Sequence, residues 1–315
     1  MDVIIVNWNS GDQLRECLSA LANARHLGYV LGRVVIVDNG SADGSANDLD
    51  YPSLPLFVIR NNINRGFAVA SNQGAAGSTS DYLLFLNPDT RVLADTLARS
   101  IRYMEDPGNE RAGIVGVQLL DENGAVSRTC ARFPATRYFV YAMLGLDRLF
   151  PTIFHNLWYL EWDHMQSRAV DHVMGAYFQI RNGLFKQLDG FDERFFVYLE
   201  DIDLSLRAWR AGWSSYYLAT AQCYHVGGGT SRQIMGRRMF YGLRSRIIYG
   251  FKNFAVPNAV ILLLATLFVE PIARLGMAMT KGSMTRVREI IEGYSLLWRT
   301  LPGILGSTIR VKARH

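Results

Sequence analysis

The stretch Val34-Val-Ile-Val-Asp-Asn-Gly-Ser41 places four consecutive apolar residues directly before a polar turn. Apolar runs of the same strand length recur through the first 120 residues, at Val3–Val6, Leu56–Ile59, Tyr82–Leu86 and Ile114–Val117. Between the first two runs, apolar residues recur at helical spacing, at Leu14, Cys17, Leu18 and Leu21. Near-continuous apolar strands that alternate with helices predict an α/β fold with a mostly parallel sheet flanked by helices.

Polar residues follow four of these apolar runs. The segments are Asn7-Trp8-Asn9, Asp38-Asn39-Gly40-Ser41, Asn61-Asn62 and Asn87-Pro88-Asp89. In open α/β sheets, ligands bind beyond the carboxyl ends of the strands. We therefore expect a polar binding site at this edge of the sheet.

The composition is that of a globular protein. The chain has 315 residues, of which 49% are hydrophobic and 19% charged, which suits one large α/β domain with an appendage and excludes a disordered chain. The three cysteines, Cys17, Cys130 and Cys223, form no C-x-x-C pair, so neither a disulfide framework nor a cysteine zinc site is expected. We expect buried thiols in a reducing compartment, and interpret Val3–Val6 as a core strand rather than a secretion signal.

Charge is divided unevenly along the chain, although the formal net charge is only +5 at pH 7. Residues 1–225 carry 19 Lys and Arg against 25 Asp and Glu, whereas residues 226–315 carry 14 against 3. The body is therefore acidic and the tail strongly basic. A basic tail prefers an anionic surface, either nucleic acid or membrane lipid.

The basic tail contains an apolar stretch, Phe254–Val269, which holds 16 residues without a charge. A straight membrane-spanning helix needs about 20 such residues. Cations flank the stretch at Arg232, Arg237, Arg238, Arg244, Arg246 and Lys252, and again at Arg274, Lys281, Arg286 and Arg288. This pattern is typical of an interfacial or re-entrant membrane anchor. The alternative is a buried helix of the domain itself or of a homo-oligomer packed through its C-terminal helices.

A helix is predicted within Phe196–Trp213. Its apolar face comprises Leu199, Ile202, Leu206 and Trp209, and the acidic residues Glu200, Asp201 and Asp203 stand at its start. Acidic residues in a first turn complement the helix dipole, which is the simplest explanation for them.

Six motifs in order resemble those of the inverting family 2 glycosyltransferases of GT-A fold, and more narrowly their rhamnosyltransferase-like branch. They are Val6-Asn-Trp-Asn9, Val37-Asp-Asn-Gly-Ser-Ala-Asp-Gly-Ser45, Asn64-Arg-Gly-Phe-Ala68 with Asn72, Leu86-Asn-Pro-Asp-Thr90, Gly175-Ala176, and Gly190-Phe-Asp-Glu-Arg-Phe-Phe-Val-Tyr-Leu-Glu-Asp-Ile-Asp203. The resemblance implies a glycosyltransferase domain over residues 1–232. We expect residues 233–315 to form a basic, apolar helical extension that associates with a membrane.

The resemblance also implies a nucleotide-sugar site. Val6, Asn7, Trp8 and Asn9 would line the base, with Trp8 available for stacking. Asp38 would accept a hydrogen bond from the imide N–H of uracil or thymine, although Asp38-Asn39-Gly40 is also good turn chemistry. The matching motif Asn64, Arg65 and Gly66 would place Arg65 on the diphosphate or sugar; the alternative is a solvated surface arginine.

A divalent metal, Mg²⁺ or Mn²⁺, is implied at Asp89, because the family's acidic metal-binding motif matches Asn87-Pro88-Asp89. Asn87 replaces the first aspartate of that pattern, so one carboxylate would hold the metal with help from phosphate, water and another side chain. His225 is the candidate for that extra ligand, with a structural histidine as the alternative. Backbone N–H groups of the following Gly227–Ser231 stretch are candidates for phosphate contact.

The resemblance places the general base in the Glu200-Asp201 pair, and the matching position is Asp201. Glu200 would support the site or touch the acceptor. The implied reaction is a single displacement with inversion, best matched by transfer of L-rhamnose from dTDP-L-rhamnose. UDP-sugar donors carrying galactofuranose, glucose or N-acetylhexosamine are alternatives.

The expected acceptor is a lipid-linked saccharide of cell-surface polysaccharide synthesis. We expect the enzyme in the cytoplasm, bound peripherally to the inner face of the cell membrane and its anionic surface, without a nucleic-acid partner. A dehydrogenase is disfavoured because Gly-x-Gly-x-x-Gly is absent after the first strand. A nucleotidyltransferase would usually show a Gly-rich basic loop there, and this loop is missing. A non-enzymatic nucleic-acid-binding protein that uses the basic tail is the alternative of another class, but the tail contains no recognisable RNA or DNA module.

Overall fold

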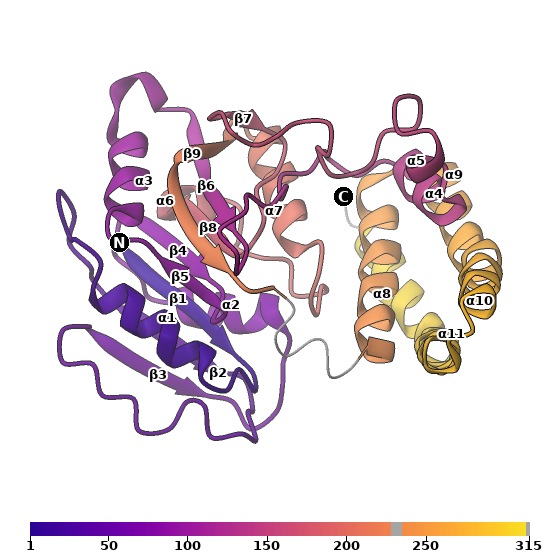
Figure 1. The fold of residues 1–315 in the computed structure, drawn as a ribbon, viewed down its shortest axis with the longest axis horizontal. Helices are drawn as coiled ribbons and strands as arrows, with labels where there is room; N and C mark the ends of the chain where they lie inside the picture. Colours follow the sequence, from indigo (N-terminus) through magenta and orange to yellow (C-terminus); the bar gives the residue numbers. More distant parts are fainter. Residues whose placement is uncertain (228–234, 313–315) are drawn as a thin grey trace. The chain divides into compact units, whose positions relative to one another are not determined.

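The computed structural model describes residues 1–227 and 235–312 of the chain, which divide into two compact units (Figure 1). The sheet unit comprises Met1–Phe133, Trp158–Glu193 and Glu200–Thr230. The helical unit comprises Pro134–Leu157, Arg194–Leu199 and Ser231–His315. Two segments of the predicted glycosyltransferase domain thus belong to the helical unit, and the predicted boundary at 232/233 lies outside the described residues.

The sheet unit is built on one mixed sheet of order β3-β2-β1-β4-β8-β6-β9-β5, with β7 paired to β9. The strands are β1 (Asp2–Asn7), β2 (Val34–Asp38), β3 (Leu56–Arg60), β4 (Tyr82–Leu86), β5 (Thr90–Val92), β6 (Ala112–Leu120), β7 (Arg168–Val170), β8 (Tyr177–Arg181) and β9 (Ser214–His225). The first four strands in the order are parallel, whereas β8 runs antiparallel to both β4 and β6. All five predicted apolar runs are strands, which confirms the expected α/β fold.

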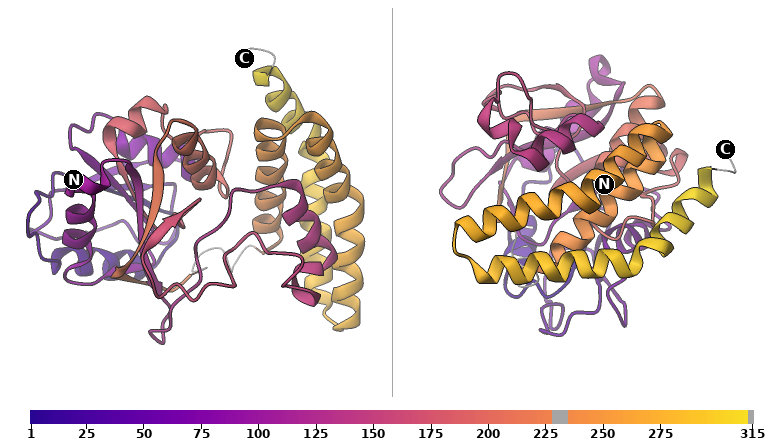
Figure 2. Two further views of the ribbon diagram at one scale, coloured as in Figure 1. Left: turned by 90° about the horizontal axis from the view of Figure 1, so that it is seen from above. Right: turned by 90° about the vertical axis from the view of Figure 1, so that its right-hand side faces the viewer.

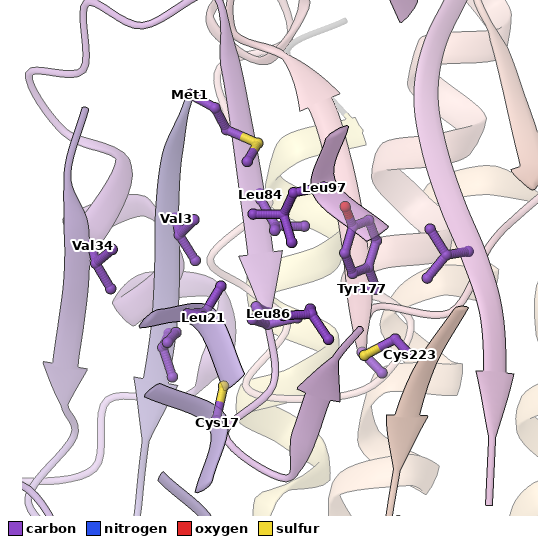
Figure 3. Close-up of a cluster of buried hydrophobic side chains, with 14 of the residues drawn as sticks. Met1, Val3, Cys17, Leu21, Val34, Leu84, Leu86, Leu97, Tyr177 and Cys223 are labelled. Carbon is purple, nitrogen blue, oxygen red and sulfur yellow. The ribbon is translucent and has the colours of Figure 1, made fainter. Parts of the chain in front are cut away.

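Helices cover both faces of this sheet. They are α1 (Gln13–Ala22), α2 (Phe67–Ala75), α3 (Thr96–Glu105), α6 (Asn182–Gln187) and α7 (Glu200–Arg210), with the short 3₁₀ helix η1 (Pro107–Asn109) after α3. Side chains of β1 alternate between the faces, so that Val3 and Ile5 join one core cluster and Ile4 the other. Figure 3 shows the first cluster, in which Cys17 and Leu21 of α1 meet the strands. The predicted face of α1 is fully buried.

The three cysteines are free and buried, as predicted. Cys17 and Cys223 belong to the cluster in Figure 3, where burial raises the pKa of the Cys17 thiol to about 12. These thiols are therefore core side chains rather than reactive groups.

The predicted helix in Phe196–Trp213 is shorter than expected. Of its predicted apolar face, Leu199 lies before the helix and Trp209 is exposed. Tyr198 and Leu199 have φ angles of 72° and 67°, which a right-handed helix excludes, so α7 begins at Glu200. Trp209 is 60% exposed, and its ring lies beside that of Phe133, with 5.7 Å between the centroids. The consequence is that Glu200 and Asp201 occupy the first two positions of the helix.

The helical unit contains α4 (Thr136–Leu144), α5 (Leu146–Leu149), α8 (Met235–Asn253), α9 (Val256–Leu264), the π-helical turn η3 (Ala265–Val269), α10 (Glu270–Thr280) and α11 (Met284–Lys312). The apolar helix extends beyond the uncharged stretch Phe254–Val269, because α9, η3 and α10 continue into one another as far as Thr280. Figure 2 shows α11 running back along α10. Among the described residues, Val256–Thr280 is the one helix long and apolar enough to cross a membrane, and 28% of its most apolar window is buried.

Replacing Gly74 by alanine tests the packing of α2 on the sheet. An added Cβ would lie 2.5 Å from Ile4 Cγ2 and 3.1 Å from Val37 Cγ2. We expect this overpacking to lower the free energy of unfolding by about 1–3 kcal/mol. Urea denaturation followed by circular dichroism measures the loss.

The matched control is Gly183→Ala in α6, where an added Cβ meets no atom within 4 Å. This variant should be as stable as the parent chain or slightly more stable. Equal unfolding midpoints for Gly74→Ala and Gly183→Ala would contradict the packing described for α2.

Candidate active site

The polar ends of β1 and β2 are joined by hydrogen bonds. The pairing of these strands sets Asn7 opposite Asp38, and Asn7 Nδ2 donates to Asp38 Oδ1 at 3.2 Å. Asn7 is fully buried and Asp38 is 7% exposed. The Arg60 guanidinium lies 3.5 Å from Asp38 Oδ2. Asp38 is therefore a fixed carboxylate at the sheet edge.

The neighbouring predicted residues lie around this carboxylate. Val6 and Trp8 are half-buried. Asn9 adopts a left-handed φ of 49°, and its Oδ1 accepts a hydrogen bond from the Ala42 N–H at 2.7 Å. The structure thus brings the segment Val6–Asn9 and Asp38 together at one edge.

Asn39 belongs to the predicted polar edge of the sheet, but the sequence interpretation assigned it no role. Its Nδ2 donates to Asn64 Oδ1 at 2.9 Å and to the Gly66 carbonyl at 3.1 Å, while its Oδ1 accepts from the Arg65 N–H at 3.0 Å. Asn39 therefore fixes the Asn64–Gly66 loop to the end of β2, and the Arg65 side chain is exposed. In the sequence, Asn39 resembles an ordinary turn residue, so these contacts could not be predicted from it.

Asp89 and His225 form the second part of the site. Thr90 pairs with His225 in the β5–β9 ladder, which brings His225 Nε2 to 3.5 Å from Asp89 Oδ1. The Asp89 carbonyl also accepts from the Val226 N–H at 3.1 Å. Of the predicted Gly227–Ser231 stretch, residues 228–231 lie outside the described residues.

One carboxylate and one imidazole suit a divalent cation that prefers oxygen and nitrogen ligands. Residues 1–227 and 235–312 contain no group of three His, Cys, Asp or Glu side chains arranged for a metal. Asp89 and His225 therefore offer two side-chain ligands for such an ion.

Asp201 lies at the same sheet edge as Asn87. Because β8 runs antiparallel to β4, Gly175 and Ala176 lie beside the end of β4, where the Asn87 N–H donates to the Ala176 carbonyl at 3.0 Å. The Gly175 N–H donates to Asp201 Oδ2 at 3.0 Å. A Cβ at position 175 would lie 2.8 Å from that oxygen, so only glycine permits this approach.

Glu200 and Asp201 lie in opposite electrostatic environments. Burial acts to raise the pKa of Asp201, but the His172 imidazole and the N–H groups of Ile202 and Gly175 outweigh it and hold that pKa below the ordinary aspartate value. Burial and then repulsion by Asp201 raise the pKa of Glu200 well above its ordinary value. Glu200 Oε2 has no hydrogen-bond partner among the described residues. The two carboxyl groups therefore have pKa values shifted in opposite directions, and Asp201 is the one whose ionised form the surroundings favour.

Asn72 orders the approach to α7. Its Nδ2 donates to the Phe191 carbonyl at 2.9 Å and its Oδ1 accepts from the Phe191 N–H at 2.9 Å. Gly190 has a φ of 67°, and a Cβ there would lie 2.6 Å from Asn72 Oδ1. These contacts explain why Asn72 and Gly190-Phe191 occur together in the motifs.

Comparisons with known proteins show which sequences this chain is similar to. The sequence model of the Glycosyl transferase family 2 matches residues 2–157, and that of the Glycosyl transferase family group 2 matches residues 82–309. The chain is 30% identical over 243 residues to an N-acetylglucosaminyl-diphospho-decaprenol L-rhamnosyltransferase of Mycobacterium tuberculosis, covering 71% of this chain and 75% of the relative. It is 28% identical over 257 residues to the rhamnosyltransferase WbbL of Escherichia coli, covering 78% and 91%.

Solved glycosyltransferases share the fold. The mannosyltransferase PcManGT from Pyrobaculum calidifontis, in complex with GDP-Man and Mn²⁺, has a TM-score of 0.54 at 18% identity and covers 99% of this chain and 86% of its own. Residues 1–349 of S. aureus TarS in complex with UDP-GlcNAc give 0.53 at 15% identity, covering 94% and 91%. These likenesses confirm the predicted GT-A architecture. From its family matches and its curated relatives, the chain belongs to the family 2 glycosyltransferases, in their rhamnosyltransferase-like branch.

Proposed function

We propose that this glycosyltransferase moves L-rhamnose from dTDP-L-rhamnose to a hydroxyl of a lipid-linked saccharide, with inversion, during cell-surface polysaccharide synthesis. The names of the two rhamnosyltransferase relatives support the sugar, and the decaprenol in the first name supports a lipid-linked acceptor. The observation that carries the reaction type is the pair Glu200 and Asp201 beside the end of β4, whose pKa values are shifted in opposite directions.

The nucleotide end of the donor would bind at Asp38. Thymine and uracil both present an imide N–H, which a fixed carboxylate accepts, whereas cytosine lacks this donor. Asn7 and Arg60 hold the Asp38 carboxylate in place without covering every lone pair. A UDP-sugar satisfies the same contact, so a thermal-stability screen of dTDP- and UDP-sugars decides between the donors.

The chemical step would follow from the ionised state of Asp201. Asp201 takes the proton of the acceptor hydroxyl, the hydroxyl oxygen forms a bond to the anomeric carbon, and the bond from that carbon to the diphosphate oxygen breaks. Attack opposite the leaving group converts a β-linked donor into an α-L-rhamnoside. When bound to Asp89 and His225, Mg²⁺ or Mn²⁺ would supply positive charge that stabilises the departing diphosphate.

Asp201→Asn tests the base. We expect turnover to fall by about 10²–10⁴-fold, because the variant keeps the shape of the side chain but loses the proton acceptor. Donor affinity should stay within about twofold of the parent value, because Asp201 lies outside the nucleotide pocket. Release of dTDP or UDP measures turnover, and calorimetry measures donor binding.

Asp50→Asn is the matched control, because Asp50 is an exposed aspartate outside the motifs that carry the site. It should leave both quantities unchanged. Near-normal turnover of Asp201→Asn would overturn the assignment of the base. Release of pyrophosphate by the parent chain would instead indicate nucleotidyl transfer.

Asp89→Ala tests the metal. With Mg²⁺ or Mn²⁺ present, we expect donor affinity to fall by about tenfold or more, which corresponds to about 1.4 kcal/mol. With EDTA present, the variant and the parent chain should bind the donor equally weakly, because the lost interaction runs through the ion. A deficit of the same size in EDTA would show that Asp89 acts without a metal.

A peripheral position on the inner face of the cell membrane is part of the proposal. Apolar side chains remain exposed at four-residue spacing along α9, η3 and α10, at Val256, Val260, Leu264, Phe268 and Ile272. The stripe on α11 has seven-residue spacing, at Met284, Ile291 and Trp298. The Phe268 and Trp298 rings lie 5.8 Å apart, so the two stripes meet. Together with the exposed cations Lys281, Arg286 and Arg288, this face fits an anionic lipid surface.

The double variant Phe268→Ser/Trp298→Ser tests the membrane face. We expect its co-sedimentation with phosphatidylglycerol vesicles to fall at least about fivefold, because it removes aromatic anchors whose burial contributes about 1.5–3 kcal/mol each. The control is Leu160→Ser/Met165→Ser, which alters two exposed apolar residues of the sheet unit. Binding of the parent chain to duplex DNA but not to vesicles at physiological salt would contradict the proposal. The proposal would also be contradicted if the parent chain formed a dimer that did not bind vesicles and the double variant were a monomer.

A further inference from the structure

A buried histidine lies against the proposed base. His172 is 1% exposed, and its two ring nitrogens face two residues of α7. Nε2 lies 3.4 Å from Asp201 Oδ2, and Nδ1 lies 3.0 Å from Ser205 Oγ. Asp201 and Ser205 are four residues apart and therefore share one face of the helix. One imidazole thus bridges two positions on the face that carries the base.

The hydroxyl of Ser205 fixes the proton on Nδ1. Ser205 Oγ donates its single hydrogen to the Asp201 carbonyl at 2.9 Å, so toward the ring it acts as an acceptor. His172 Nδ1 therefore carries a hydrogen. A second, bare ring nitrogen facing a carboxylate would be repelled by it. A proton between Nε2 and Asp201 Oδ2, 3.4 Å apart, removes this repulsion and joins the two side chains.

The backbone holds the ring where it is. The His172 N–H donates to the Ala131 carbonyl, and the Ala131 N–H donates to the His172 carbonyl, both at 3.1 Å. The ring also packs near Phe178, at 6.5 Å between centroids. His172 is thus anchored independently of α7, and Asp201 is positioned against a fixed partner.

The other charged groups around Asp201 do not replace His172. On α7, Glu200 and Asp203 are acidic and supply no positive charge to Asp201, and Asp203 is paired with Arg207 Nε at 2.8 Å. Next to His172 in the chain, Asp171 Oδ2 accepts from the Phe133 N–H at 2.9 Å. Among the described residues, His172 is therefore the basic side chain that contacts Asp201.

We infer that His172 is the positioning residue of the base: its Nε2 pairs with Asp201 Oδ2, and together with the Gly175 N–H it orients the carboxylate toward the acceptor hydroxyl. The inference rests on the proposed role of Asp201. The Asp201 side chain is 19% exposed, so part of it stays open to an acceptor. His172 acts through Asp201 and does not itself take the acceptor proton.

The sign of the pH dependence follows from the pKa of Asp201. That pKa lies below its ordinary value, so the base form survives as the pH falls and is lost only below the ordinary aspartate range. Without His172, the largest influence that lowers the pKa of Asp201 is lost, while burial still acts to raise it. The acid limb of the pH–rate profile should then move to higher pH.

His172→Phe and His172→Gln test the inference. For His172→Phe we expect the acid limb of kcat/KM to move up by at least about one pH unit, with turnover at pH 7 lowered about tenfold and donor affinity unchanged. His172→Gln restores a donor without the charge, so it should recover part of the turnover while the limb stays shifted. Ser205→Ala removes the acceptor for Nδ1 and should shift the limb in the same direction by less.

A purely structural role would give a different result. It would lower the rate equally at every pH, reduce donor affinity or lower the unfolding midpoint, and leave the acid limb in place; that pattern would overturn the inference. If His172→Phe does not fold, NMR of the parent chain decides. In a chain with ¹³C-labelled aspartate, we expect the Asp201 carboxyl to titrate below the ordinary aspartate value of about 3.9.

The NMR titration also separates this inference from the proposed function. An ordinary Asp201 titration in a chain that transfers sugar would refute the His172 inference alone. A depressed titration in a chain that transfers no sugar would refute the proposed function alone.

Discussion

The parallel pairing of β1 with β2 is the constraint on which the site depends. Its register sets Asn7 opposite Asp38 at the carboxyl ends of two buried strands. A buried amide without partners would cost about 1–3 kcal/mol. Asn7 avoids that cost, because its Nδ2 reaches Asp38 and the hydroxyls of Ser41 and Ser45 at 2.9–3.2 Å. The hydrogen bonds that make the strand ends compatible with burial therefore also organise the proposed nucleotide pocket before any ligand binds.

The antiparallel strand β8 extends this organisation to the base. It returns the chain along β4 so that Gly175 and Ala176 reach the same edge as Asn87, and α7 then presents Asp201 to the Gly175 N–H. Adjacent helical residues point about 100° apart, so Glu200 and Asp201 cannot share one environment. Glu200 is buried, and its Oε2 has no hydrogen-bond partner among the described residues, whereas Asp201 meets an imidazole and two N–H donors. The pKa values of two carboxyl groups adjacent in sequence are thereby shifted in opposite directions.

Local patterns were enough to predict the strands, the buried face of α1 and the polar sheet edge, because each depends on periodicity within a few residues. The Asp89 and His225 pair was also proposed from motifs, and the two side chains do lie together. The start of α7 was not predictable, because the positive φ angles of Tyr198 and Leu199 leave no local mark in residues of these types. His172 was missed for a similar reason: a single histidine in an apolar stretch resembles a core residue until the fold brings it to Asp201.

The division of charge along the chain does not by itself make the tail a lipid-binding segment. Buried Glu270 pairs with both Arg246 and Arg274, so two of the tail's cations are neutralised within the helical unit. Each cation left near an anionic surface contributes only about 1 kcal/mol, and salt screens it. The exposed cations Lys281, Arg286 and Arg288 would therefore give weak, salt-sensitive attraction on their own. Stable association requires the apolar face where Phe268 meets Trp298, so the shape of the helical unit matters more to the proposed membrane role than its net charge.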